Sequence, residues 1–404
     1  MLVVGRRVIP WALHGTAHTG SRELFRLAVL AIAFCFTPVS SVFACPFCTA
    51  VSQTLRQEME IMDAVVIASA LQGDVTRNAD TGEVEMKIET VLKGDSHVEA
   101  GQHVKVVYFG DVAKGRRFLL SGADPSDMQW SCLPVTPQAE QYLLRIPDIA
   151  KKNAADRLRF YLPYLQDENS MLSRDAYDEF AITPYTDLQQ IKADMDHGQL
   201  VEWIQDETMS PDRKRLYLTM LGVCGSKADI PLLEGMLIST QKTSRTGLDA
   251  LIACYLTLAG EPGLELINEQ FLLNQQASYA DTYAAIMAIR FHGTEGGVIP
   301  RSALVESLHV ILDRSDLADL VIPDLARWED WSQVDKLKEL FLTADADNNW
   351  VRVPVVNYLR ACPKPEAAEA LKELEKADPA SVRRANTFFS VPKPAAANVE
   401  PSKQ

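Results

Sequence analysis

The sequence has few of the features that mark a nucleic-acid-binding protein. Basic residues are the scarcer charged class, with 40 Lys and Arg against 54 Asp and Glu in 404 residues, which gives a net charge of −14. Such a balance repels a phosphate backbone unless a local basic stripe exists, and the sequence contains none. We therefore expect protein partners and no nucleic acid.

Motifs for catalysis, metals and cofactors are missing as well. Two of the seven histidines, His14 and His18, lie in the N-terminal segment before Arg22, and no two of the other five have the helical spacing of a metal site. Neither a Gly-x-Ser-x-Gly elbow nor a glycine-rich phosphate loop occurs. Asp345 and Asp347 lie in a polar loop without the glycine and terminal glutamate of a calcium loop. We expect no enzymatic activity, no catalytic residues, no metal and no cofactor.

Long hydrophobic runs are also missing, and the one notable run lies near the N-terminus. Arg22 and Arg26 precede the apolar segment Leu27–Phe36, and small residues lead up to Ala44. This is the pattern of a secretory signal peptide. The run has about ten residues, too few to cross a hydrocarbon core of roughly 30 Å, and no later segment is long enough to span a bilayer. We expect residues 1–44 to be removed and the mature protein to be periplasmic or extracellular.

Cleavage after Ala44 would make Cys45 the first residue of the mature chain. Lipidation of Cys45 is the alternative, because Val42 and Ala44 fit a lipobox. Bulky Phe43 does not fit it. We therefore expect a free amine at Cys45 and keep a lipid anchor as the second outcome.

Six cysteines follow the signal peptide. Cys224, Cys254 and Cys362 lie within apolar helical patterns, where a cysteine usually acts as a small buried hydrophobe. The segment Cys45–Cys48, with sequence Cys-Pro-Phe-Cys, has the spacing of a thiol-disulfide oxidoreductase, although no strand precedes it. A haem attachment would need a histidine where Thr49 stands, and a zinc site would need a second ligand cluster. Oxidoreductase activity of Cys45 and Cys48 stays as an alternative function.

Residues 63–145 have the pattern of short strands with hairpin turns, and a helical pattern precedes them over residues 49–62. Glu83–Leu92 alternates with period two, and Asp63–Ala70 is rich in strand-forming residues. Five or six short antiparallel strands in about 100 residues predict a small OB-type barrel over residues 45–147. The other expected strands are 104–109, 117–121, 128–133 and 141–145.

The order of these segments resembles the netrin-like domain found in the tissue inhibitors of metalloproteinases and related secreted proteins. The resemblance implies a disulfide from Cys48, or from Cys45, to Cys132. It also implies another alternative function, inhibition of a metalloprotease whose zinc would be chelated by the amine and carbonyl of Cys45. It covers residues 45–146 and rests on the N-terminal cysteine pair, Asp63–Ala70, Val91–Gly94, Val106–Phe109, Arg117–Gly122 and Trp130–Cys132.

From about residue 156 the pattern becomes helical and repeats. Turn-like segments recur at intervals of roughly 31 to 38 residues, each with an apolar helix before and after it. Two helices per unit at this period predict an α-solenoid over residues 156–380, with units that resemble HEAT repeats. We expect a disordered tail over residues 381–404. The turns are Gly222–Gly225, Gly260–Gly263, Gly293–Gly296, Glu329–Ser332 and Cys362–Pro365.

Aromatic and basic residues adjoin at two places in the expected solenoid. Arg327, Trp328 and Trp331 form one group, and Trp350 and Arg352 form the other. Trp and Arg are frequent anchors of protein interfaces, although packing between repeats would use the same residues. We take the five as candidate partner-binding residues.

The sequence thus predicts a β-then-α multidomain protein that acts as an exported, non-enzymatic protein-binding scaffold of the cell envelope.

Overall fold

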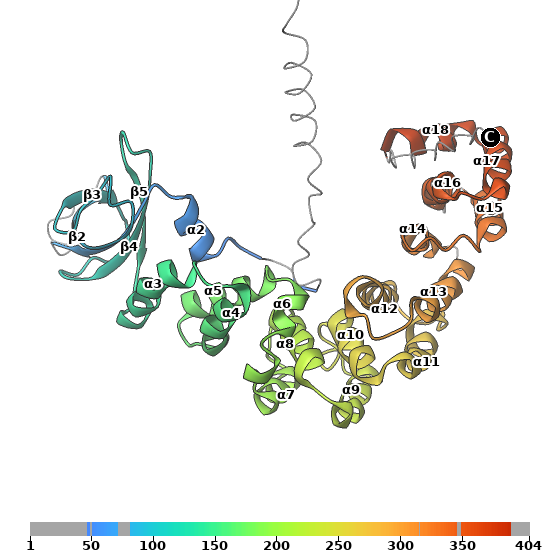
Figure 1. Cartoon of the computed structure of the whole chain (residues 1–404), viewed down its shortest axis with the longest axis horizontal. Coiled ribbons are helices and arrows are strands. Elements are labelled where there is room, and N and C mark those ends of the chain that lie inside the picture. The colour runs from blue at the N-terminus through green and yellow to red at the C-terminus, as the bar shows by residue number, and fades with distance from the viewer. Residues whose placement is uncertain (1–46, 49–50, 72–80, 315, 346–348, 389–404) are drawn as a thin grey trace, which may run out of the picture. The chain divides into compact units, whose positions relative to one another are not determined.

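The computed structural model describes residues 47–48, 51–71, 81–314, 316–345 and 349–388. A five-stranded antiparallel sheet is followed by helices in paired contacts, which confirms the predicted β-then-α architecture (Figure 1). The expected signal peptide and Cys45 lie outside the described residues. Cleavage and lipidation therefore stay predictions.

The sheet curls on itself. Its strands are ordered β3-β2-β1-β4-β5, and β3 also contacts β5, which brings the two edges together as in an OB-type barrel. The strands are β1 (Ala64–Ala70), β2 (Glu83–Lys93), β3 (His103–Val107), β4 (Arg117–Ala123) and β5 (Gln129–Pro134).

Strand β1 is buried on both faces, which explains its unbroken apolar sequence. Val66 packs with Phe118 of β4 in the barrel interior. Val65 and Ile67 point to the opposite face and belong to the core that the helices share. Since alternate side chains of a strand point to opposite faces, β1 joins the two cores.

The expected strand over residues 141–145 is wrong, because these residues belong to helix α3 (Pro137–Ile149). Thr136 caps the helix by accepting a hydrogen bond from the backbone N–H of Ala139, and Pro137 fits its first turn. The side chains at i, i+3, i+4 and i+7 are then buried against the helical core, namely Ala139, Tyr142, Leu143 and Ile146.

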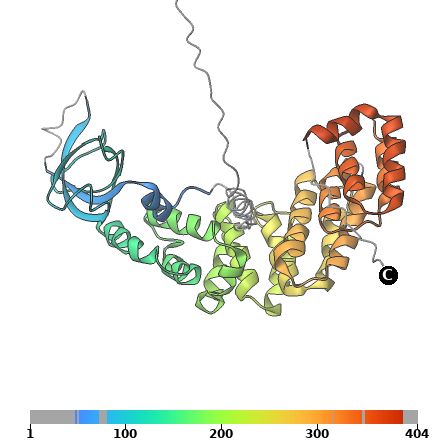
Figure 2. The same ribbon diagram turned by 45° about the horizontal axis from the view of Figure 1, so that its top comes forward.

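The helices contact one another in two consecutive rows, a first row of α8, α10 and α12 and a second row of α14, α16 and α18. Helix α10 contacts both α8 and α12, and α16 contacts both α14 and α18. The second row lies at the orange-to-red end of the chain (Figure 2). The helices are α2 (Leu55–Ile61), α4 (Ala154–Tyr161), α5 (Ser170–Ala181), α6 (Tyr185–Gln189), α7 (His197–Gln205), α8 (Pro211–Cys224), α9 (Ile230–Leu237), α10 (Leu248–Ala259), α11 (Leu264–Ile267), α12 (Tyr279–Phe291), α13 (Arg301–His309), α14 (Ile322–Arg327), α15 (Val334–Thr343), α16 (Arg352–Ala361), α17 (Pro365–Ala377) and α18 (Pro379–Phe388).

Helix α18 corrects the expected boundary of the tail. It extends to Phe388, so the expectation of disorder from residue 381 is wrong for residues 381–388. Asp378 accepts hydrogen bonds from the backbone N–H groups of Ala380 and Ser381, which stabilises the start of the helix, and Val382 is buried. Residues 389–404 lie outside the described residues.

The disulfide implied for Cys132 is wrong, because Cys132 is a free thiol on β5. Cys132 packs against the barrel interior, opposite Leu120 of β4. Cys48 instead packs against the helical core, where its neighbour Phe47 contacts Phe291 of α12 with ring centroids 5.2 Å apart. The two cysteines are thus held by different cores.

Candidate partner-binding groove

An apolar groove lies between α14, α16 and α18. Its volume is about 780 Å³, within the range of roughly 300–1,000 Å³ that is typical of ligand pockets. Val353, Asn357 and Ala361 of α16 line it at helical spacing. Its other lining residues include Pro323, Ala326, Arg327, Trp350, Pro354 and Arg384.

Trp350 stands at the groove because the residues that follow it are anchored. Val351 is fully buried. Arg352 donates hydrogen bonds to the carbonyl oxygens of Phe341 and Ala344 and forms an ion pair with Asp378 at 2.8 Å. These contacts fix the short turn Asn349–Val351 and leave the Trp350 side chain 51% exposed.

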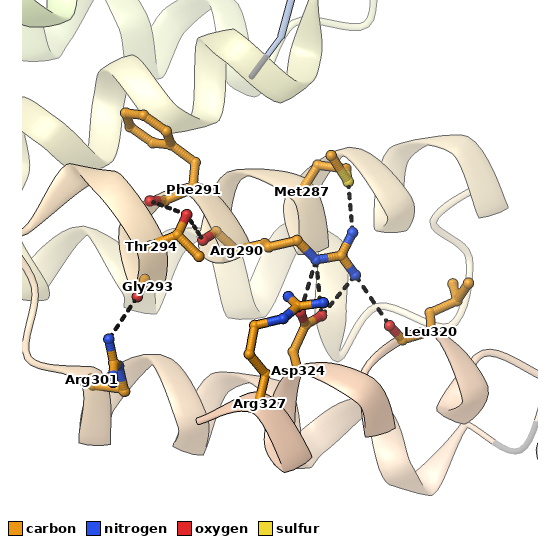
Figure 3. Close-up of polar contacts among 9 residues, drawn as sticks. All are labelled: Met287, Arg290, Phe291, Gly293, Thr294, Arg301, Leu320, Asp324 and Arg327. Carbon is orange, nitrogen blue, oxygen red and sulfur yellow. Dashed lines mark hydrogen bonds and ion pairs between the residues drawn. The ribbon is translucent and has the colours of Figure 1, made fainter. Parts of the chain in front are cut away.

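Arg327 reaches the same groove from α14. Its Nη1 atom donates to Oδ1 of Asp324 at 2.6 Å, and Arg290 of α12 binds the same carboxylate (Figure 3). The Asp324 side chain is fully buried, whereas the Arg327 side chain is 53% exposed. Arg327 is therefore oriented by a buried acid while it remains accessible to a partner.

The remaining candidates lie in packing positions. Trp328 is nearly buried against Gly293, where any side chain would collide with the indole ring. Trp331 packs edge-on against Tyr358, with ring centroids 5.1 Å apart. Together with the anchored Arg352, these residues stabilise contacts between helices. The structure thus brings two of the five candidates, Arg327 and Trp350, together in one groove.

Arg384 and Asn357 are among the groove residues that the sequence did not indicate. Arg384 on α18 is exposed, and Asn357 on α16 has a buried Oδ1 atom without a hydrogen-bond partner among the described residues. Asn357 shares a helix face with Val353 and Ala361, so the spacing of these three residues was the available signal. Arg384 fell in the segment expected to be disordered.

Cys132 and Cys224 are poor nucleophiles. Burial raises the pKa of the Cys132 thiol to about 12, and burial also raises the pKa of Cys224 above its ordinary value. Among the described residues, no three His, Cys, Asp or Glu side chains converge on a point where they could hold a metal ion. The described helices include none with the length and apolar character needed to cross a bilayer.

Comparison with known proteins identifies no family. No family model matches the chain, and no solved structure matches it. A stretch of 33 residues is 61% identical to part of the putative cation/proton antiporter YbaL of Escherichia coli (strain K12). That stretch covers 8% of this chain and 6% of the antiporter's length.

Proposed function

We propose that this chain is an exported, non-enzymatic protein-binding scaffold of the cell envelope, whose partner docks in the groove between α14, α16 and α18. The observation that carries the proposal is that the half-exposed Trp350 and Arg327 both line one apolar groove. Trp and Arg dominate the binding energy of protein interfaces, particularly where an apolar pocket adjoins them.

We further propose that the curled sheet is a netrin-like domain and that the paired helices are HEAT-like repeats. A netrin-like domain is supported by the strand order of the curled sheet, and HEAT-like repeats are supported by the paired helices. Repeats of this kind commonly use their surfaces to bind partners.

Site-specific photo-crosslinking tests the proposed docking site. A photoreactive amino acid at exposed Asn349, on the groove, should crosslink an envelope protein, and Trp350→Ala should abolish the crosslink. The same amino acid at Ile238, which is 59% exposed and lies outside the groove, is the control. Equal crosslinking from both positions, or crosslinking unchanged by Trp350→Ala, would contradict the proposal.

The free thiol of Cys132 favours a second candidate function, thiol-disulfide exchange by Cys45 and Cys48. Because Cys132 is free, it does not form the structural disulfide with Cys48 or Cys45 that the resemblance implied. Cys45 lies outside the described residues. Insulin reduction by the mature chain, lost in Cys48→Ser and kept in Cys132→Ser, would support this candidate.

A further inference from the structure

We propose that the groove binds an extended, acidic segment of the partner protein. In this arrangement an apolar side chain of the segment fills the groove beside Trp350, carboxylates pair with Arg327 and Arg384, and a backbone N–H donates to Asn357. The inference rests on the proposed function and specifies the chemistry of its partner.

The charges at the groove select a carboxylate. Arg290 and Arg327 both bind the single carboxylate of Asp324, so one positive charge of this cluster stays uncompensated. Arg327 is the more exposed of the two arginines, with 53% of its side chain accessible against 27% for Arg290. The excess charge is therefore presented at the groove.

Arg384 adds a second positive charge from α18. It is exposed and forms no ion pair within the part of the chain that the structure describes. None of the described residues that line the groove is acidic. This local basic surface stands out in a chain with a net charge of −14, and it complements an acidic partner.

Asn357 selects an extended backbone. Its buried Oδ1 atom has no donor among the described residues, and leaving a buried acceptor without a hydrogen bond is unfavourable. An interior turn of an α-helix has no N–H to offer, because its N–H groups already bond within the helix. An extended segment does present free N–H groups, and so it can satisfy Asn357 when it enters the groove.

Peptide display on the full mature chain tests the inference. Random 12-residue peptides should be selected that combine Asp or Glu with a large apolar residue. The best peptide should bind at least tenfold more weakly to Trp350→Ala and to Arg327→Gln, and Ile238→Ala should leave its affinity unchanged. Replacing its acidic residues by Asn or Gln should weaken binding to the unmodified chain to a similar extent.

Backbone methylation of the selected peptide tests the contact with Asn357. One N-methylated position should lose at least tenfold in affinity for the unmodified chain and much less for Asn357→Leu, which has already lost the acceptor. Loss at every position, or equal loss on both proteins, would overturn the contact.

The outcomes separate this inference from the proposed function. Neutral or basic peptides that still depend on Trp350 would overturn the acidic segment and leave the docking site intact. Peptides that bind Trp350→Ala with full affinity would overturn both. Failure to enrich any peptide would overturn the extended segment, and the crosslink from Asn349 would still decide the docking site.

Discussion

The guanidinium of Arg290 lies against both carboxylate oxygens of Asp324, with Nε 2.9 Å from Oδ1 and Nη2 2.7 Å from Oδ2. The pair connects α12, the last helix of the first row, to α14, the first helix of the second. An equivalent pair, Arg215 with Asp249 at 2.9 Å, connects α8 to α10. Asp324 differs from Asp249 in being fully buried, and it also orients Arg327 toward the groove.

Removing the buried carboxylate of Asp324 should therefore destabilise the protein more than removing the carboxylate of Asp249. We expect Asp324→Asn to lower the free energy of unfolding by about 3 kcal/mol, because it leaves the partly buried Arg290 without its counter-ion. The matched change Asp249→Asn should destabilise the protein less, since the side chain of Asp249 is 19% exposed and water can solvate the arginine that loses its partner. Urea denaturation measures both, and equal losses would contradict the special role of Asp324.

Trp328 and Trp350 should also differ in how strongly their replacement by alanine destabilises the protein. Trp328→Ala should destabilise the protein by about 3–5 kcal/mol, because it opens a cavity against Gly293. Trp350→Ala should cost no more than about 1 kcal/mol, because half of that side chain is already in water. Thermal denaturation checks both variants. A large loss of stability in Trp350→Ala would instead assign Trp350 to packing.

Asp175 of α5 should make stability depend on pH. Its carboxylate accepts hydrogen bonds from the backbone N–H of Leu55 at 2.7 Å and from the Tyr142 hydroxyl at 2.6 Å. Burial nevertheless dominates and raises its pKa from 3.8 to about 6. The folded protein therefore holds a proton here that the unfolded chain releases between about pH 4 and pH 6.

The contribution of protonated Asp175 to the free energy of unfolding is fully present below about pH 4, and it is lost as the pH rises to about 6. The loss amounts to about 3 kcal/mol in the free energy of unfolding. Asp175→Asn should flatten this part of the profile, as urea denaturation across the pH series would show. Asp148→Asn, at a side chain that is 82% exposed, should leave the profile unchanged. An unaltered slope in Asp175→Asn would contradict the raised pKa.

Cys132 should be recovered as an unreactive free thiol. Because burial raises its pKa to about 12, iodoacetamide at pH 8 should not modify it in the folded protein. After unfolding without reductant, the peptide that contains Cys132 should carry the label. Mass spectrometry of the two samples decides this, and recovery of Cys132 in a disulfide-linked peptide would restore the pairing that the resemblance implied.

Much of the architecture could be predicted from periodicity alone. A helix follows the expected turn Gly222–Gly225, at Ile230–Leu237, and another precedes the expected turn Gly293–Gly296, at Tyr279–Phe291. Their apolar residues recur at a spacing that only a helix places on one face. Glu83–Lys93 likewise follows its period-two pattern. The pattern of residues 141–145 fits both a strand and a helix, because five residues are too few to distinguish a period of two from one of about 3.6. The N-cap that decides for the helix, Thr136, lies outside this segment.

The order of strands before helices, the repeat of helix pairs and the excess of acidic charge were thus determined by the sequence itself. Only the tertiary structure decided which aromatic residues face a partner. Trp328 and Trp350 each have an arginine nearby in the chain, yet one is covered by Gly293 and the other lies beside the groove. Exposure depends on residues that are distant in sequence and adjacent in space, and for the same reason Cys48 and Cys132 are held apart in two different cores.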